Sequence, residues 1–361
     1  MQQRIVIKVG TNVITQEDGL LDLTAISHII DQLVTIKKKG IEVVLVSSGA
    51  VGAGRSLYPK TKGLSKVIQR QVFSAIGQVQ LMHWYQSLLS NYQIFCAQVL
   101  ATKEDFRDRQ HYLNMQNCLL GLMRNDVLPI VNENDVVSIN ELMFTDNDEL
   151  ASLIAAMINA DTLVILSSVD GVFNGDPKDI DSQLITEVKA KDKKAEEVVL
   201  PQKSSFGRGG MSTKIRMAQQ SASMGTTVVI ANGKRKNILL DILSGDYVGT
   251  TFPAASNLSN VKKWMVHNKQ AHQAEVIINE GAVERLRSRD QICSLLPIGV
   301  LEIKGSFKKG DLIKILSETG ETIALGIAQY TSEKAAEYLG QKGKKAMVHY
   351  DYLYVEDQLE D

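Results

Sequence analysis

The sequence contains few cysteines and histidines, and their spacing argues against disulfide and metal frameworks. The three cysteines, Cys96, Cys118 and Cys293, lie far apart, and no two of them form a Cys-x-x-Cys pair. They therefore indicate reduced thiols in a cytoplasmic protein. The six histidines do not cluster, so the sequence predicts no zinc or iron site.

Long hydrophobic runs and an excess of one charge are also missing. No stretch reaches the roughly 20 apolar residues of a membrane helix, and no apolar signal core precedes the first strand-like residues. Lys and Arg total 40 and Asp and Glu total 41, a net charge of -1. This balance argues against a protein whose main work is non-specific binding of nucleic acid. We therefore expect a cytoplasmic location and no membrane contact.

The length and the periodicity predict an α/β domain over residues 1–250. A chain of 361 residues exceeds one ordinary domain, and 44% hydrophobic residues allow a sizeable core. Short apolar runs alternate with helical spacing, which is typical of a mainly parallel sheet covered by helices on both faces. The expected strands are 4–7, 41–46, 94–100, 127–131, 162–166 and 226–230, and the expected helices are 23–33, 64–91, 110–125, 147–159 and 211–224.

The pattern changes after residue 250. Pro, Ser, Asn and Lys are frequent from 253 to 263, which predicts a linker over 251–272. Short strand-like runs punctuated by glycines follow, and they predict a small, mostly β domain over 273–361. These runs begin at Glu275, Gly299, Leu312 and Ile323.

Two polar or glycine-rich segments follow the first two expected strands, where parallel sheets bind ligands. Lys8-Val9-Gly10-Thr11 places an ammonium and backbone N–H groups at the expected end of a strand, which suits a phosphate. A lysine leaving a strand is more often only a solvated residue. Residues 47–54 are small, and their Gly-x-x-Gly-x-Gly order is the reverse of a dinucleotide fingerprint, which argues against NAD. A tight turn with close helix packing explains them about equally well.

Two further segments carry polar chemistry. Asn132-Glu133-Asn134-Asp135 follows a buried strand, and Asp146-Asn147-Asp148 comes shortly after. Such dense polarity is costly unless a ligand is bound there, although Asp146 is better explained as a helix N-cap. Gly207-Arg208-Gly209-Gly210 opens a helix with Lys214 in its first turn, which predicts an anion site. It is not a Walker A loop, because the Gly-Lys-Ser/Thr order is missing.

Together the segments supply two lysines, two glycine-rich anion loops and a few acidic residues, but no candidate catalytic His or Cys. This set suits phosphoryl transfer, in which positioning and charge neutralisation dominate.

In these segments the sequence resembles the glutamate 5-kinases, which belong to the amino acid kinase family and carry a C-terminal PUA domain. The resemblance covers essentially the whole chain and implies the amino acid kinase fold followed by a PUA domain. Two positions depart from the pattern: Ser167-Ser168 stands where Thr-Asp or Ser-Asp is frequent, and Arg208 where Thr is frequent. The matching strings are 46–50, 132–135, 146–148, 209–214, 279–282 and 294–299.

The resemblance also implies roles for individual residues. Lys8 and Lys214 would contact the transferring phosphoryl group, and Asp148 would hold both lysines. The implied substrate-binding residues are Ser48, Gly49, Ala50, Asp135 and Asn147. The implied nucleotide-binding residues are Lys8, Gly10, Ser167, Ser168, Arg208, Gly209, Gly210, Met211, Ser212, Thr213 and Lys214.

The expected reaction is attack of the L-glutamate side-chain carboxylate on the γ-phosphate of ATP, the first step of proline biosynthesis. A free glutamate side chain has a pKa of about 4.3, so it is ionised at neutral pH and needs no general base. Asp135 is the candidate partner of the substrate ammonium. We expect Mg²⁺ to be held mainly by the ATP phosphates and expect no protein metal site.

The alternatives are another member of the family and an RNA-binding protein. Acetylglutamate, aspartate, carbamate and uridylate kinases are the family rivals, and the C-terminal β domain argues against them. PUA modules commonly bind RNA, but here the basic and acidic residues are interspersed, which indicates a solvated surface. The resemblance further implies feedback inhibition by proline and a homo-oligomer, either a dimer or a tetramer. Handover of the labile product to glutamate-5-semialdehyde dehydrogenase is a hypothesis.

Overall fold

The computed structural model describes residues 2–16, 18–58, 63–138, 144, 146–189, 210–255, 259–269, 272–288 and 293–355. The chain divides by its internal contacts into two units. The first comprises residues 1–105 and 113–257, and the second comprises residues 106–112 and 258–361. The short segment 106–112 belongs to the second unit, where the Phe106 carbonyl accepts hydrogen bonds from Trp264 Nε1 at 2.8 Å and Asn268 Nδ2 at 3.0 Å.

The first unit is built on a mainly parallel sheet. Among the described residues, seven strands pair in the order β3-β4-β2-β1-β5-β8-β9, and only β9 runs antiparallel to its neighbour. All six strands expected in this region are present, whereas β9 was not predicted. The strands are β1 Arg4–Val9, β2 Glu42–Ser47, β3 Cys96–Ala101, β4 Leu128–Glu133, β5 Thr162–Ser167, β8 Thr227–Asn232 and β9 Gly249–Phe252.

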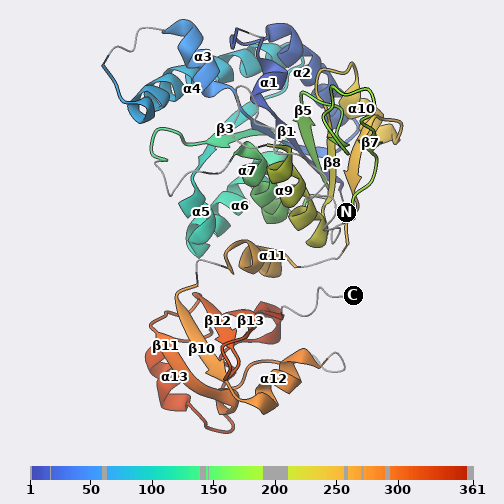
Figure 1. Ribbon diagram of the computed structural model, residues 1–361. Coiled ribbons are helices and arrows are strands. Elements are labelled where there is room, and N and C mark those ends of the chain that lie inside the picture. The colour runs from blue at the N-terminus through green and yellow to red at the C-terminus, as the bar shows by residue number, and fades with distance from the viewer. Residues whose placement is uncertain are drawn as a thin grey trace. The chain divides into compact units, whose positions relative to one another are not determined.

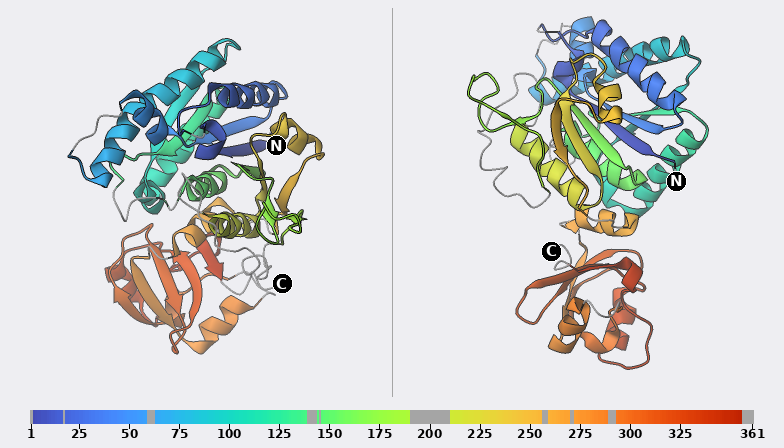
Figure 2. Two further views of the ribbon diagram at one scale, coloured as in Figure 1. Left: turned by 45° about the horizontal axis from the view of Figure 1, so that its top comes forward. Right: turned by 90° about the vertical axis from the view of Figure 1, so that its right-hand side faces the viewer.

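Helices cover both faces of this sheet, as Figures 1 and 2 show. On one face α2 (Leu23–Lys38) and α4 (Lys66–Ser90) build an apolar core with the strands. On the other face α7 (Asn147–Ile158) and α9 (Met211–Ser223) pack against β1, β5 and β8. The remaining elements of this unit are α1 Thr11–Ile14, α3 Ala50–Leu57, α10 Ile238–Ser244, β6 Val172–Phe173 and β7 Leu184–Ile185. Helices α5 Lys103–Arg107 and α6 Arg109–Arg124 each have one part in this unit and one part in the segment 106–112.

The first strand is longer than the sequence suggested. It continues to Val9, so Lys8 lies inside β1 and pairs in register with Val46 and Ile165, instead of standing at a strand end. Successive side chains of a strand point to opposite faces. Ile7 and Val9 belong to the core under α2 and α4, so Lys8 points to the opposite face, which α7 and α9 cover.

The small residues after β2 form a helix instead of the expected glycine-rich loop. α3 begins at Ala50, and its glycines allow close contact with α4. A Cβ on Gly54 would lie 1.8 Å from the Phe73 carbonyl oxygen, and one on Gly77 would lie 1.8 Å from the Ala50 carbonyl oxygen. Close helix packing, one of the two explanations that the sequence allowed for residues 47–54, therefore holds at Gly54. Gly49, Ala50 and Gly52 line the cavity described below.

The second unit is small and mostly β. Its described residues form a five-stranded sheet in the order β11-β10-β12-β13-β14, in which β10 and β12 are parallel and the other pairs antiparallel. The range expected to be a linker contains the end of β9 and helix α11. The elements are α11 Asn260–His267, β10 Ala274–Ile278, α12 Glu280–Arg287, η3 Pro297–Gly299, β11 Val300–Gly305, β12 Leu312–Leu316, β13 Thr322–Ile327, α13 Ser332–Tyr338, η4 Tyr350–Tyr352 and β14 Leu353–Val355.

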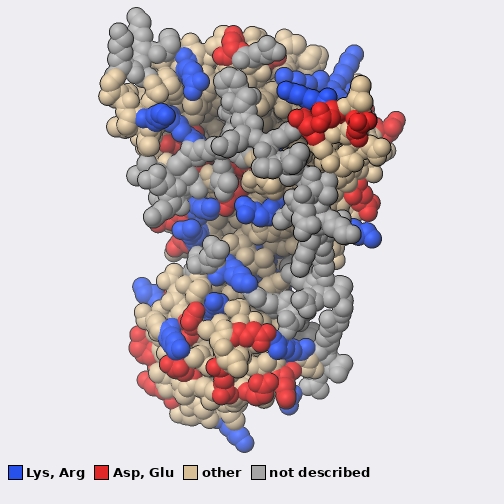
Figure 3. All heavy atoms as spheres, in the orientation of Figure 1, with Lys and Arg blue, Asp and Glu red and all other residues tan. Residues whose placement is uncertain are grey.

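Charges are mixed on the face of the molecule drawn in Figure 3. On the face drawn in Figure 3, basic and acidic side chains of the described residues are interspersed on each unit, in keeping with the net charge of -1. None of the described helices combines the length and the apolar character needed to cross a membrane.

Candidate functional site

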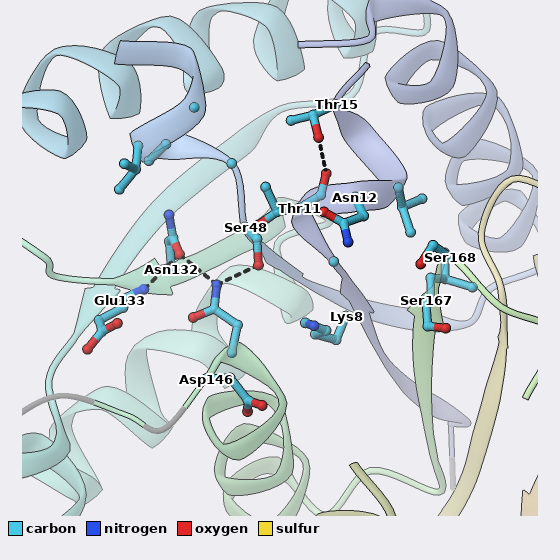
Figure 4. Close-up of a pocket in the computed structure, with 18 of the residues that line it drawn as sticks. Lys8, Thr11, Asn12, Thr15, Ser48, Asn132, Glu133, Asp146, Ser167 and Ser168 are labelled. Atoms are coloured by element: carbon cyan, nitrogen blue, oxygen red, sulfur yellow. Dashed lines mark hydrogen bonds between the residues drawn. The ribbon is translucent and has the colours of Figure 1, made fainter. Parts of the chain in front are cut away.

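A cavity of about 380 Å³ opens in the first unit, at the carboxyl ends of β1, β2, β4 and β5. This is the edge at which parallel sheets bind ligands. In the view of Figure 4, Lys8 lies between Asn132 and Glu133 on one side and Ser167 and Ser168 on the other. The residues expected in the site that line this cavity are Lys8, Gly10, Ser48, Gly49, Ala50, Asp135, Asn147, Ser167, Ser168, Gly210, Met211 and Lys214.

Two lysines meet one carboxylate beside this cavity. Lys8 comes from β1, Asp148 from the first turn of α7 and Lys214 from the first turn of α9. Lys8 Nζ lies 2.6 Å from Asp148 Oδ1, and Lys214 Nζ lies 2.7 Å from Asp148 Oδ2. Asp148 is 0% exposed and does not line the cavity, whereas both lysines do. We call Lys8, Asp148 and Lys214 the lysine trio.

Electrostatics hold Asp148 and Lys214 in their ionised forms. Burial raises the pKa of the Asp148 carboxyl, but the two lysine charges beside it outweigh burial and hold that pKa well below its usual range. Burial lowers the pKa of the Lys214 ammonium, but the Asp148 carboxylate outweighs this effect and raises it overall. With both lysines charged, the trio presents one net positive charge to the cavity.

The start of α9 adds to this positive end of the cavity. Gly210 is the N-cap of α9, and Gly210 and Met211 line the cavity beside Lys214. The first turn of a helix carries unpaired N–H groups and the positive end of the dipole. Ser212 and Thr213 belong to this turn but do not line the cavity. Arg208 and Gly209 lie outside the described residues.

A network of amide groups forms the other end. Asn147 Nδ2 donates to Ser48 Oγ at 2.9 Å, to Asn132 Oδ1 at 3.0 Å and to the Ser47 carbonyl at 3.2 Å, and Figure 4 shows the contacts at Ser48 and Asn132. Asn147 Oδ1 accepts no hydrogen bond from the described residues. The nitrogen of this amide is therefore committed to the protein, and its oxygen remains available to a ligand.

Asp146 caps α7, as the sequence indicated. Its Oδ1 accepts hydrogen bonds from the backbone N–H groups of Asp148 at 3.0 Å and Glu149 at 3.1 Å. Its Oδ2 is buried and has no partner among the described residues, although the residue lines the cavity. Burial and the nearby Asp148 charge raise the pKa of Asp146 to about 6.

Glycine is required where β2 turns into α3. Gly49 has φ of 104°, a left-handed conformation that favours glycine. A Cβ at this position would also lie 2.8 Å from Ile14 Cδ1. The backbone of Gly49 and Ala50 therefore lines the cavity directly.

The serines at the end of β5 differ in their availability. Ser167 Oγ is engaged by the backbone of Val169, donating to the carbonyl and accepting from the N–H at 3.1 Å each. Ser168 is exposed and lines the cavity. Ser168 is therefore the more available of the two hydroxyl groups for a ligand.

Sequence reasoning missed a polar stripe on α4, formed by Arg70, Ser74 and Gln78. Arg70 donates to Asp135 Oδ1 from Nε at 3.0 Å and from Nη2 at 2.5 Å. Ser74 Oγ donates to Asp135 Oδ2 at 3.0 Å, and Gln78 Oε1 accepts from Asn132 Nδ2 at 2.9 Å. A signal was present in the sequence, because polar residues spaced by four share one face of a helix.

Glu133 joins this acidic end of the cavity. Its carboxylate lies 3.4 Å from Arg70 Nη2 and accepts a hydrogen bond from the Phe144 N–H at 3.0 Å. Burial, followed by the Asp135 charge, raises the pKa of Glu133 to about 7. The cavity thus has a strongly positive end at the lysine trio and an end where two carboxylates share one guanidinium.

Comparisons with protein families cover both units. The profile of the Amino acid kinase family matches residues 3–232, and that of the PUA domain matches residues 274–350. The chain is 47% identical over 356 residues to the glutamate 5-kinase of Bacteroides thetaiotaomicron, covering 98% of each sequence. It is 45% identical over 353 residues to the glutamate 5-kinase of Chlorobaculum tepidum, covering 98% of this chain and 97% of that one.

Solved structures share the fold of the first unit. Carbamate kinase from Giardia lamblia bound to AMP-PNP matches with a TM-score of 0.53 and 22% identity, over 70% of this chain and 99% of that one. UMP kinase from Ureaplasma parvum matches with a TM-score of 0.51 and 17% identity, over 70% of this chain and 99% of that one. These likenesses confirm the expected fold.

Proposed function

The chain belongs to the amino acid kinase family and carries a PUA domain, and from this premise we propose that it phosphorylates the side-chain carboxylate of L-glutamate with ATP. The product would be L-glutamyl 5-phosphate, the first intermediate of proline biosynthesis. The observation that carries the acceptor is the 47% identity to a glutamate 5-kinase over 98% of the chain, PUA domain included. The UMP kinase and the carbamate kinase above are 17% and 22% identical over 70% of the chain and share the fold of the first unit.

The geometry of the lysine trio supports the proposed chemistry. An ionised acceptor carboxylate must approach a triphosphate of the same sign, and the reaction needs charge neutralisation more than proton transfer. Lys8 and Lys214 would contact the transferring phosphoryl group, and Asp148 would hold both ammonium groups in place. Asp148 is too acidic to serve as a base, because both lysines lower its pKa.

The nucleotide would lie over the start of α9 and the end of β5. Its proposed contacts along the cavity are Gly10, Ser167, Ser168, Gly210, Met211 and Lys214. Contacts by Arg208, Gly209, Ser212 and Thr213 are predictions from sequence only. We propose that Mg²⁺ arrives with ATP, is held mainly by the phosphates and screens their charge. The buried, unpartnered Asp146 Oδ2 fits a hydrogen bond from a water of such an ion.

The acceptor would occupy the opposite end. Its reacting carboxylate would face Lys8, within reach of Ser48, Gly49 and Ala50. Its ammonium would meet Asp135 and the free Asn147 Oδ1, because a buried ammonium needs anionic or carbonyl-type acceptors. Proline also carries an ammonium and an α-carboxylate, so we propose that it inhibits by binding at the same end.

Other expectations remain predictions. These are a cytoplasmic location, assembly into a homo-oligomer (a dimer or a tetramer) and contact with glutamate-5-semialdehyde dehydrogenase. RNA binding by the PUA domain is the rival function, and the mixed surface charge argues against it.

An ADP-release assay with hydroxylamine trapping of the acyl phosphate tests the function. We expect glutamate to give ADP and a hydroxamate, N-acetylglutamate, aspartate and UMP to give little of either, and proline to suppress the glutamate reaction. Faster turnover of one of the other three acceptors would overturn the proposal.

A further inference from the structure

The acceptor of the proposed function is an α-amino acid, and its α-carboxylate has no cationic partner among the residues predicted from sequence. Ser48, Gly49, Ala50, Asp135 and Asn147 include no positive charge. In the proposed function the lysine trio contacts the phosphoryl group at the other end of the cavity. An α-carboxylate beside Asp135 and the partly ionised Glu133 would meet repulsion unless a cation stood there.

Arg70 stands at this place. Arg70 lines the cavity, and its guanidinium donates hydrogen bonds to Asp135 and Glu133 through Nε and Nη2. Its side chain is 27% exposed, whereas the Asp135 and Glu133 side chains are 8% and 5% exposed. Nη1 makes no hydrogen bond with the described residues, so it remains free to donate.

The position of Arg70 is fixed before a ligand arrives. Asp135 is itself anchored by Ser74 from the same helix, one turn further along α4. Such anchoring removes most of the rotamer freedom that an arginine would otherwise lose on binding. A guanidinium also offers several N–H groups in one plane, which suits a carboxylate.

Resting on the proposed function, we propose that Arg70 binds the α-carboxylate of the acceptor through Nη1 and so selects α-amino acids over acceptors that lack this group. Asp135 then has two tasks: it orients Arg70 and it faces the ammonium. The α-carboxylate and the ammonium of the amino acid are thus bound by two adjacent groups of opposite charge, Arg70 and Asp135.

Arg55 also lines the cavity and is the matched control. It is exposed, comes from α3 and lies over the Phe73 ring at 5.8 Å, and no described carboxylate pairs with it. The backbone N–H groups at the start of α3 are a further possible anion site. They remain in every side-chain variant, so a site formed by them alone would survive the loss of Arg70.

The test compares Arg70→Met, Arg70→Lys and Arg55→Met with three compounds. Glutamate carries a side-chain carboxylate, an ammonium and an α-carboxylate. 4-Aminobutanoate lacks the α-carboxylate, and glutarate lacks the ammonium. Turnover is measured by ADP release. Where a compound turns over too slowly, its binding is measured instead as the concentration of that compound that halves glutamate turnover. Thermal unfolding with and without ATP shows whether each variant keeps its fold.

We expect Arg70→Met to lower kcat/KM for glutamate and for glutarate by about 10- to 100-fold, because the variant loses a charged hydrogen bond. 4-Aminobutanoate should change by less than about threefold. Arg70→Lys should recover part of the loss, and Arg55→Met should keep the wild-type preference for glutamate over 4-aminobutanoate.

Equal losses for all three compounds would overturn the proposal, since Arg70 would then act only by holding Asp135. An unchanged preference in Arg70→Met, or its loss in Arg55→Met, would also overturn it. These outcomes differ from failure of the proposed function, which would appear as wild-type protein that forms no hydroxamate from glutamate.

Discussion

Replacing Asp148 by Asn removes the carboxylate that both lysines of the trio share. The ion pairs at 2.6 Å and 2.7 Å each correspond to about 6 kcal/mol at an effective dielectric constant of about 20. Desolvation of the buried ions offsets much of this attraction. Removal of one partner from a buried ion pair typically lowers the free energy of unfolding by about 3–5 kcal/mol, and we expect a loss of this size.

Catalysis should suffer in a specific way. In Asp148→Asn the two ammonium groups lose their anchor and repel each other, so their positions relative to the phosphoryl group shift. Misplacement by about 1 Å can cost on the order of 100-fold in rate, so kcat should fall by about this factor. The KM for ATP should not rise, because the site becomes more positive and still attracts the triphosphate.

Denaturant unfolding and steady-state ADP release measure the two effects. The control is Asp126→Asn, which removes an 87% exposed carboxylate from its ion pair with Lys37 at 2.7 Å. Asp126 has φ of 58°, a conformation that Asn also accepts. This control should lose at most about 1 kcal/mol and keep its activity. An Asp148→Asn protein as stable and as active as the control would refute the reasoning.

Three further predictions concern other parts of the first unit. Lys214→Ala should lower kcat at least about 100-fold in the ADP-release assay, and wild-type-like turnover would exclude its contact with the phosphoryl group. Gly54→Ala should lower the free energy of unfolding by about 3 kcal/mol, because the new Cβ would lie 1.8 Å from the Phe73 carbonyl oxygen. Gly121→Ala, with open space around it, is the control and should be neutral or stabilising; equal effects of both would contradict the packing argument. The raised pKa of Glu133, from 4.5 to about 7, should make wild-type stability fall by roughly 3 kcal/mol as pH rises through that window. Urea unfolding at several pH values should show this fall reduced in Glu133→Gln, and an identical pH dependence in both proteins would rule it out.

The alternation of apolar runs and helical spacing was sufficient to predict the sheet and its covering helices, because burial on both faces imposes that pattern on parallel strands. The same reasoning placed Asp148 and Lys214 at helix starts on one edge of the sheet. It placed Lys8 at a strand end, however, because apolar periodicity does not show where a strand stops. It also left a ligand-binding loop and close helix packing equally open for Gly52 and Gly54, because a glycine that permits helix packing looks the same in sequence as one that permits a turn.

The polar stripe on α4 shows the limit most clearly. Arg70 and Asp135 are 65 positions apart, and local sequence patterns do not show which distant residues come into contact. Only the packing of α4 against the end of β4 brings them together. The spacing of Arg70, Ser74 and Gln78 by four residues is a signal, missed in the sequence analysis, that one face of α4 is polar, but it does not show which strand that face meets.

The two ends of the cavity should therefore respond differently to pH. The pKa of Asp148 lies well below its usual range and that of Lys214 lies above, so both groups keep their charges near neutrality. Glu133 has a pKa of about 7 and faces Arg70, Asp135 and the Phe144 N–H, whereas the Asp146 carboxyl has a pKa of about 6. Above pH 7 the ionised Glu133 carboxylate neutralises part of the Arg70 charge. Arg70 then attracts an acceptor carboxylate less strongly.

We accordingly expect the KM for glutamate to rise between about pH 6.5 and pH 8.5, while kcat at saturating substrate stays nearly constant. Glu133→Gln should flatten the KM profile, because an amide does not ionise in this range. Glutarate, which keeps the α-carboxylate position, should follow glutamate, whereas 4-aminobutanoate should show little dependence. A KM profile that persists unchanged in Glu133→Gln would place the titrating group elsewhere and separate Glu133 from acceptor binding.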